Sequence, residues 1–487
     1  MAPPTGLEAQ LWDAIQRGNT ADAIELLAQG ADPESRNPLH AWTPLHVVAR
    51  QGNVALTDIL LALGANVDAL DQKAYSPLQY AVYVKTSGRL AVAHRLLLAN
   101  ASIDVPGQTG QALLSLTKRD PDKAMFELLS AHKAIRDATP DDKVRAQAAL
   151  KTWLETHNIP TTRNDDDMAM LLQRAAVYGC ARVVERLVNA AVGMATCVSD
   201  GLDLLAIAVR DGHDLLARAL YERMYPSVAS IAATDVRYED HDLGCGIYYY
   251  VRKGVYKDAM DIKLQTTIRS PYMPPLLATV DDDSNNLKMV TEFMDQGNLF
   301  DYLRKKRHGD FVAIEVTTVQ VAWVIANAIQ DLHRQNIVHR DVKSLKVLLS
   351  SKHGVKLSGI ASARTVHGLM THDVGTPMWT APEVFSRDYH VDEVVDGTPA
   401  DIYSFGVVLT ELDTGDEPYA ADLRTSSHRD IIPRVLAGTL RPSMGPDCAP
   451  WLRELADRCL AFDPSERPTA ADIVAMLAPH LNDQPAP

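Results

Sequence analysis

Residues 337–348 read Ile-Val-His-Arg-Asp-Val-Lys-Ser-Leu-Lys-Val-Leu, and residues 355–361 read Val-Lys-Leu-Ser-Gly-Ile-Ala. An apolar pair, typical of a strand end, runs directly into His339-Arg340-Asp341, and a second apolar pair closes the first stretch. Between the two pairs, a single carboxylate stands beside the cations Lys343 and Lys346. The pattern predicts a polar loop held between two apolar segments, with Asp341 as its carboxylate.

This loop resembles the catalytic loop of protein kinases, where the aspartate accepts the proton of the substrate hydroxyl. The resemblance implies that role for Asp341 and a contact with the transferred phosphate for Lys343. In the family, an asparagine five residues after the aspartate binds magnesium, as does the aspartate of Asp-Phe-Gly. The matching residues here are Lys346 and Gly359. The resemblance therefore implies a catalytic base without the two side chains that hold the metal.

Further landmarks extend the resemblance over a whole kinase domain, from about residue 235 to residue 481, and the likeness is closest to the tyrosine-kinase-like group of serine/threonine kinases. Residues 375–383 resemble the end of an activation segment, in which Thr376 is implied to hydrogen-bond the two catalytic residues. Glu383 and Arg467 are implied to form a buried ion pair. The ion pair predicts a folded C-lobe and does not bear on activity, whereas the resemblance implies a catalytic role for Thr376 beside Asp341 and Lys343.

The nucleotide-binding half departs further from the family. Residues 243–251 resemble a glycine-rich loop, but Tyr249 replaces the third glycine and would crowd a phosphate. No glutamate lies between Lys263 and Glu292 to pair with the phosphate-binding lysine, so the helix that normally carries it is predicted to be deleted or reduced to one turn. The resemblance implies these nucleotide-binding positions: Gly244, Gly246, Val251, Lys263, Thr291 (the gatekeeper), Glu292, Met294, Leu348 and Lys346.

The N-terminal half contains an internal repeat. Thr43-Pro44-Leu45-His46 recurs 33 residues later as Ser76-Pro77-Leu78-Gln79, and such a period indicates a solenoid. The pattern resembles ankyrin repeats, in which the threonine caps the first helix and the proline occupies its first turn. We expect a structural role for His46, through hydrogen bonds to neighbouring backbone. Gly179 and Gly212 show the same 33-residue spacing later in the chain.

The predicted fold class is multidomain, with an all-α ankyrin solenoid followed by a two-lobed α+β protein-kinase fold. The order of the two resembles that of the integrin-linked kinase family. The predicted boundaries are 5–138 for ankyrin repeats, 139–167 for a helical linker, 168–230 for further ankyrin-like repeats, 238–294 for the kinase N-lobe with a reduced helix, and 295–482 for the C-lobe.

Composition narrows the class of partner. The formal net charge of −14 argues against nucleic acid and anionic membranes, and no apolar run reaches the ~18 residues of a bilayer span. The start, Met1 to Thr5, lacks the pattern of a secretory signal, and the five cysteines are scattered, so we expect a cytoplasmic protein. Protein partners are expected at the repeats. The alternative is that the repeats pack on the kinase-like domain.

The positive charge of Lys346 determines what we expect of metal binding and of kinase activity. Two unit charges ~4 Å apart interact by roughly 4 kcal/mol at a surface-like dielectric, and Lys346 would repel a divalent ion by twice that. Bound Mg²⁺ is therefore not expected, whereas ATP remains possible if Lys346 and Lys263 neutralise its phosphates. The first hypothesis is a pseudokinase that acts as a signalling scaffold or regulator. The second is a weakly active ATP-dependent serine/threonine kinase that uses Asp341, and the third treats both halves as inert interaction surfaces.

Overall fold

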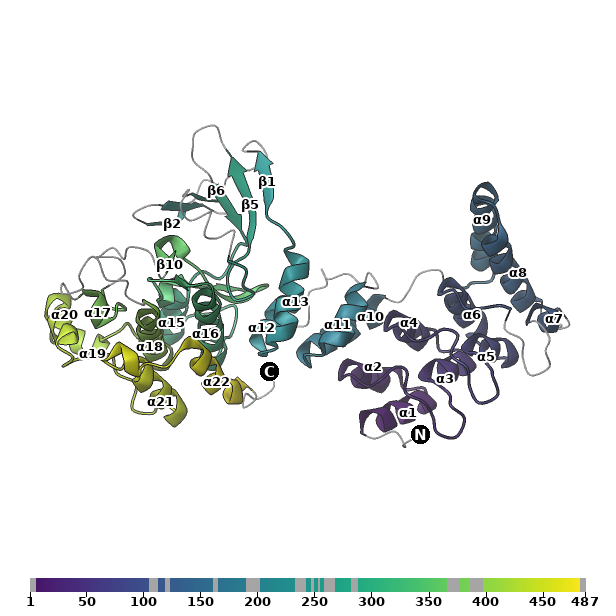
Figure 1. The fold of residues 1–487 in the computed structure, drawn as a ribbon, viewed down its shortest axis with the longest axis horizontal. Helices are drawn as coiled ribbons and strands as arrows, with labels where there is room; N and C mark the ends of the chain where they lie inside the picture. The colour runs from purple at the N-terminus through teal and green to yellow at the C-terminus, as the bar shows by residue number, and fades with distance from the viewer. Residues whose placement is uncertain are drawn as a thin grey trace. The chain divides into compact units, whose positions relative to one another are not determined.

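The computed structural model describes residues 6–104, 113–118, 123–160, 165–189, 202–232, 242–246, 249–252, 255–257, 268–281, 288–365, 377–385 and 397–481. The chain forms two compact units, Met1–Thr196 and Cys197–Pro487 (Figure 1). Among the described helices, none combines the length and the apolar character needed to cross a bilayer.

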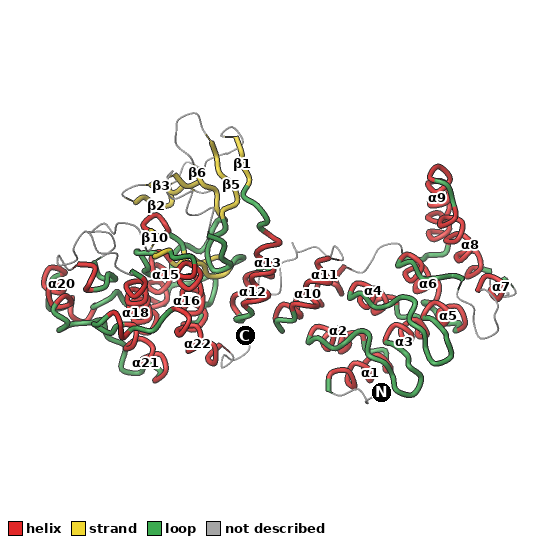
Figure 2. The backbone as a smooth tube through the Cα atoms, in the orientation of Figure 1, coloured by secondary structure: helices red, strands yellow, loops and turns green. Residues whose placement is uncertain are grey.

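Unit 1 is built from helices, most of which pack against the next helix along the chain (Figure 2). Its helices are α1 (Leu7–Arg17), α2 (Thr20–Ala28), α3 (Pro44–Gln51), α4 (Val54–Ala62), α5 (Pro77–Tyr83), α6 (Arg89–Leu98), α7 (Leu113–Thr117), α8 (Ala124–Asp137), α9 (Pro140–Thr156), α10 (Asp165–Val177) and α11 (Ala181–Asn189).

The repeated Thr-Pro-Leu-His motif forms the start of α3 as predicted. Thr43 is the N-cap of a capping box, and Pro44 occupies the first turn. The His46 ring accepts a hydrogen bond from the Thr43 amide at 3.0 Å, and its Nε2 lies 3.0 Å from the carbonyl oxygen of Tyr75 in the next repeat. Burial lowers the pKa of His46, which favours the neutral ring that this bonding needs. The predicted structural role of His46 is confirmed.

The later helices of unit 1 do not form a simple continuation of the stack. α9, in the segment predicted as a linker, packs on α8, and α10 packs on α2. Polar contacts fix the second arrangement: Tyr178 donates to Glu25, and Arg186 donates to the carbonyl of Leu63. α10 begins at Asp165, three residues before the predicted boundary.

Unit 2 combines a six-stranded sheet with a larger set of helices (Figures 1 and 2). Its first elements are α12 (Leu204–Arg210), α13 (Asp214–Met224), β1 (Ala229–Ala232), β2 (Asp242–Gly246), β3 (Tyr249–Arg252), β4 (Val255–Lys257), β5 (Leu276–Asp281), β6 (Lys288–Thr291), α15 (Leu299–His308), α16 (Thr318–Arg334) and β7 (Ile337–Val338). The remaining elements are η2 (Ser344–Lys346), β8 (Val347–Ser350), β9 (Gly354–Leu357), η3 (Ile360–Ser362), β10 (Arg364–Thr365), α17 (Pro382–Phe385), α18 (Thr398–Thr414), α19 (Ala420–Leu423), α20 (His428–Leu436), α21 (Pro450–Cys459), η4 (Pro464–Glu466) and α22 (Ala470–Leu481).

The six-stranded sheet has the order β1-β5-β6-β4-β3-β2. β1 pairs parallel with β5, whereas the other pairs are antiparallel. Two short antiparallel pairs, β7 with β10 and β8 with β9, frame the loop that contains Asp341. The predicted reduction of the helix after Lys263 falls outside the described residues.

The core of the helical part is α16. Every residue from Val321 to Leu332 is buried. The reason is that α22, α18, α12, β7 and β9 pack around it. A helix surrounded in this way has little polar surface to show.

The segment predicted as continuing repeats, 168–230, is divided between the two units. α10 and α11 belong to unit 1, whereas α12 and α13 belong to unit 2. All α12 residues from Leu204 to Val209 are buried, against α13, α16 and β9. Arg218 of α13 forms an ion pair with Asp331 of α16 at 2.8 Å, and Tyr272 donates to Asp214 at 2.8 Å. This helix pair is therefore an integral part of the packing of unit 2.

Candidate functional site

The catalytic-loop residues predicted from the sequence meet in one place. The loop leaves β7, and Asp341 Oδ1 lies 2.8 Å from Lys343 Nζ. On the other side, Asp341 Oδ2 lies 3.6 Å from Lys346 Nζ. All three side chains are 12–15% exposed, so their charges interact at short range with limited screening by water. Two cations thus flank the carboxylate that would act as the base.

The side chain of Lys346, at the first metal position, occupies the space beside Gly359, at the second. Gly359 has φ +91°, and a Cβ added to it would lie 2.6 Å from Cδ of Lys346. The amide and hydroxyl of the preceding Ser358 both donate to the Lys346 carbonyl, at 2.8 and 2.9 Å. The aliphatic part of Lys346 therefore covers Gly359, and any side chain at residue 359 has to displace it. The left-handed φ adds strain for any residue but glycine.

A buried carboxylate, Asp401, holds the catalytic loop in place through hydrogen bonds. Asp401 of α18 accepts the amides of His339 and Arg340, each at 2.8 Å, and lies 2.9 Å from Nε2 of His333. Arg340 adopts φ +67°, a conformation that these bonds help to maintain. Burial on its own would raise the pKa of Asp401, but hydrogen bonding and the charge of His333 outweigh it and hold that pKa below the usual value.

A second buried carboxylate joins the loop to the end of the activation segment. Glu411 accepts the hydroxyl of Ser344 at 2.6 Å and the indole N–H of Trp379 at 2.7 Å. Burial raises the pKa of Glu411 to about 7. The ion pair of Arg467 with Glu383 is present as predicted, with two bonds of 2.6 and 2.9 Å.

The implied nucleotide positions are only partly described. Thr291 ends β6, Met294 is buried beyond it, and Leu348 lies in β8, where it bridges to Asn298. Gly244 and Gly246 lie in β2 and Val251 in β3, and Gly246 is the register partner of Tyr249. Strand pairing thus includes the position where the family has its third glycine. Lys263 and Thr376 lie outside the described residues.

The side chain of Glu292 is engaged elsewhere. Tyr225, at the end of α13, donates to Glu292 Oε1, which also lies 3.5 Å from His353 Nδ1. The same His353 nitrogen lies 2.8 Å from Asp203, the N-cap of α12. Sequence reasoning missed Asp203 and Tyr225. Their only signal is the position of Asp203 before an apolar helix.

Magnesium does not fit the residues at its two usual positions, because one is a cation and the other has no side chain. Within the part of the chain that is described, no group of three histidine, cysteine, aspartate or glutamate residues could hold a metal ion. The absence of bound Mg²⁺ remains a prediction, since several segments of the nucleotide-binding half lie outside that part.

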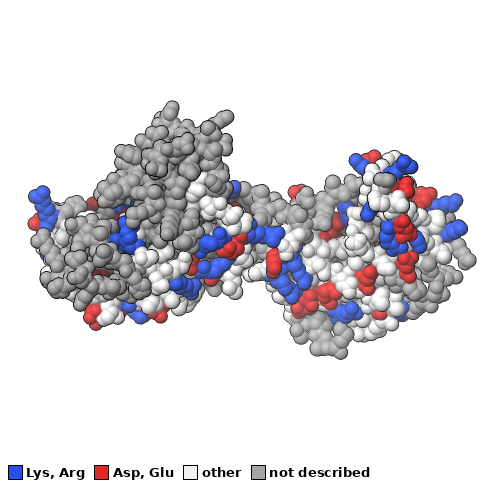
Figure 3. Space-filling view, turned by 45° about the horizontal axis from the view of Figure 1, so that its top comes forward, with Lys and Arg blue, Asp and Glu red and all other residues white. Residues whose placement is uncertain are grey.

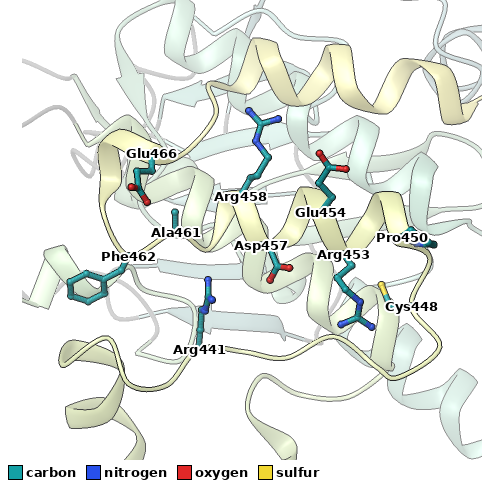
Figure 4. A pocket seen from close by; sticks show the side chains of 10 residues that line it. All are labelled: Arg441, Cys448, Pro450, Arg453, Glu454, Asp457, Arg458, Ala461, Phe462 and Glu466. Carbon is teal, nitrogen blue, oxygen red and sulfur yellow. The ribbon is translucent and has the colours of Figure 1, made fainter.

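A separate pocket lies on the C-lobe around α21 (Figure 4). None of its lining residues belongs to the predicted site. Three arginines and three carboxylates line it, so its formal charges balance. The charged lining residues are Arg441, Arg453, Arg458, Glu454, Asp457 and Glu466.

Comparison with known proteins agrees with this geometry. Residues 253–477 match the protein kinase domain family, and residues 11–107 match ankyrin repeats in three copies. The chain therefore contains ankyrin repeats followed by a C-terminal protein kinase domain.

Similar curated proteins carry serine/threonine kinase names. The chain is 34% identical over 196 residues to serine/threonine-protein kinase STY17 of Arabidopsis thaliana, which covers 40% of this chain and 32% of that protein. It is 34% identical over 191 residues to serine/threonine/tyrosine-protein kinase HT1 of the same plant, covering 39% and 46%. A putative serine/threonine-protein kinase/receptor of Acanthamoeba polyphaga mimivirus is 32% identical over 236 residues, covering 47% and 14%. The chain thus spans less than half the length of each of these relatives.

Proposed function

We propose that this chain is a pseudokinase that acts as a signalling scaffold or regulator, in which the kinase fold is kept and Mg²⁺-dependent phosphoryl transfer is lost. The observation that supports this most is Lys346, which pairs with Asp341 and covers Gly359. Phosphoryl transfer depends mainly on positioning and on neutralisation of charge by Mg²⁺. Lys346 places a cation at one metal position, and its chain covers the glycine at the other. This arrangement opposes both the positioning of the phosphates by Mg²⁺ and the neutralisation of their charge by Mg²⁺.

The chain's own residues support a more limited role for the cleft. Lys343 and Lys346 present two ammonium groups on either side of Asp341, a local excess of positive charge that favours an anion such as a phosphate. The ankyrin repeats are proposed to recruit a protein partner to this module.

A second candidate function is a weakly active ATP-dependent serine/threonine kinase. It is favoured by the 2.8 Å pairing of Asp341 with Lys343 and by the buried framework that holds the loop. The names of the relatives are compatible with it. In this alternative, Asp341 acts as the base and Lys346 replaces part of the metal's charge.

Phosphoryl transfer by the purified full-length protein separates the two candidates. We expect no transfer from radiolabelled Mg·ATP to itself or to a generic serine/threonine substrate above the level of the Asp341→Asn variant. Transfer well above that level, lost in Asp341→Asn, would establish the weak kinase and refute the pseudokinase. Unfolding curves of the two proteins check that both are folded.

A further inference from the structure

Five ring side chains gather on the surface of unit 1 that is formed by α3, α5 and the loops before them. The ring of Trp42 lies edge-on to Tyr80, with centroids 5.4 Å apart, and tilted to His40 at 5.1 Å. Tyr75 lies edge-on to Tyr80 at 5.9 Å and to Tyr83 at 5.6 Å. These distances are those of interacting aromatic pairs. We call these five residues the aromatic cluster.

A buried carboxylate fixes the cluster in place. Asp71 Oδ2 accepts the indole N–H of Trp42 at 3.0 Å and the hydroxyl of Tyr80 at 2.7 Å. Its Oδ1 accepts the amides of Lys73 and Tyr75, each at 2.8 Å. Asp71 is 8% exposed, and four donors occupy its two oxygens. Rings held in this way offer contact area with little further loss of conformational entropy on binding.

Exposed apolar side chains extend the cluster. Tyr83 is 44% exposed, and Leu39 and Leu70 are 73% and 44% exposed. The two leucines lie in adjoining loops, since Arg36 donates to the Leu70 carbonyl at 3.0 Å and the Gln72 amide donates to the His40 carbonyl at 3.0 Å. Contiguous exposed apolar groups mark interaction surfaces, and aromatic anchors contribute most of the energy at such surfaces.

The charge available beside the cluster is positive. The guanidinium of Arg50 lies 5.3 Å from the centroid of the Trp42 ring, and the side chain is exposed. Among the described residues, no carboxylate forms an ion pair with Arg50, whereas Asp71 is buried and its two oxygens are occupied by four donors within the cluster and its loops. A guanidinium stacked on a ring keeps its N–H edges for a planar carboxylate. On the face seen in Figure 3, side chains of both signs are interspersed over the described residues.

We propose that the aromatic cluster, with Arg50, Leu39 and Leu70, is the docking surface for an acidic segment of another protein. In that segment, an aspartate or glutamate lies beside an apolar side chain. The carboxylate pairs with Arg50, and the apolar side chain packs on Trp42 and Tyr83. This inference rests on the proposed function in one respect, the recruitment of a protein partner by the repeats.

Selection from a phage-displayed library of random 16-residue peptides tests the proposal on the immobilised full-length protein. We expect the enriched peptides to share an acidic residue within a few positions of Leu, Ile or Phe. The most enriched peptide, labelled with fluorescein, is then titrated by anisotropy. We expect Arg50→Glu to weaken binding by about tenfold or more and Tyr83→Ala by about threefold or more.

A matched control makes the same charge change outside the proposed docking surface. Arg145→Glu alters an exposed arginine of α9, outside the surface, and is expected to leave the affinity unchanged. Circular dichroism melting curves check that all variants remain folded. We also expect the affinity to fall as salt rises, because an exposed ion pair is screened.

Three results would overturn the proposal: enrichment of basic peptides, no enrichment over a protein-free surface, or equal affinity for the Arg50→Glu variant. The second result includes the case in which the kinase-like half of this chain covers the surface. None of them changes the outcome of the phosphoryl-transfer assay, so failure here is distinct from failure of the pseudokinase proposal.

Discussion

Below the catalytic loop, Asp401 accepts two backbone amides at 2.8 Å and Glu411 accepts two side-chain donors, all in a buried environment. On the other side of the same loop, the two metal ligands of the family, an asparagine and an aspartate, are replaced by Lys346 and Gly359. The residues that hold the catalytic loop are thus distinct from the positions that would bind metal. The loop conformation depends on the buried acceptors Asp401 and Glu411. Metal binding depends on the side chains at residues 346 and 359, which do not hold the loop.

The largest expected effect comes from breaking the framework. Asp401→Ala leaves the amides of His339 and Arg340 buried without their acceptor, so we expect a loss of about 4 kcal/mol in the free energy of unfolding. Urea unfolding followed by tryptophan fluorescence measures it. Lys346→Ala is the matched change on the other side of the loop and is expected to cost less than about 1 kcal/mol. Equal effects would remove the distinction between the two sides.

The stability that the buried Glu411 contributes is also predicted to depend on pH. The pKa of Glu411 is raised from 4.5 to about 7 in the folded protein, so the folded state binds more protons than the unfolded one between these values. The stabilising contribution is complete below about pH 4.5 and is lost as the pH rises through about 7. This corresponds to roughly 3 kcal/mol, at ~1.4 kcal/mol per pKa unit.

Urea unfolding of wild type and Glu411→Gln across pH 4.5 to 8 measures this contribution. The stability of wild type relative to the variant should fall over this range. Glu454→Gln, an exposed carboxylate of the same lobe, provides the baseline. A difference between wild type and Glu411→Gln that stays constant with pH would contradict the assigned protonation.

A smaller effect is expected where the helix pair α12–α13 joins the kinase fold. Asp203 caps α12 through the Ala206 amide at 2.7 Å and pairs with His353 at 2.8 Å. We expect Asp203→Ala to destabilise unit 2 by about 2 kcal/mol, of which about 1 is the lost cap. Asn19→Ala in unit 1 removes a cap whose second side-chain bond, to Asp22, stays within the same exposed helix start, and about 1 kcal/mol is expected. Equal losses would mean that the pairing with His353 adds nothing.

The smallest effect concerns the packing of Lys346 over Gly359. Gly359→Ala should cost more in the wild type than in the Lys346→Ala background, because the alanine methyl group meets the lysine chain. We expect a coupling free energy of about 1 kcal/mol in a double-mutant cycle measured by urea unfolding. Additive losses would show that the two residues do not share the space.

The sequence predicted the elements whose signal is local. The capping motif at Thr43 placed α3. The ion pair of Glu383 with Arg467, which joins distant residues, was implied only by the resemblance to protein kinases. The sequence could not predict which surface a helix buries. Gly179 and Gly212 follow the same repeat spacing, yet their helix pairs belong to different units, because the contacts that hold α12 come from α16 and β9, far along the chain.

The candidate site shows the same division. The kinase pattern identified Asp341, Lys343 and Lys346, and the structure brings them together. The contact of Lys346 with Gly359 follows from side-chain packing, and no spacing in the sequence reports it. The engagement of Glu292 by Tyr225 was missed for a similar reason, since Tyr225 precedes the kinase-like segment and carries no motif.

The most direct test of the central claim is a titration with ATP, read by the shift of the thermal unfolding midpoint, in the presence of Mg²⁺ and in the presence of EDTA. The account predicts the same response under both conditions for the wild-type protein. The Lys346→Asn, Gly359→Asp double variant, which restores both ligand types, should acquire a larger shift with Mg²⁺. A wild-type shift that appears only with Mg²⁺, or grows clearly with it, would contradict the account.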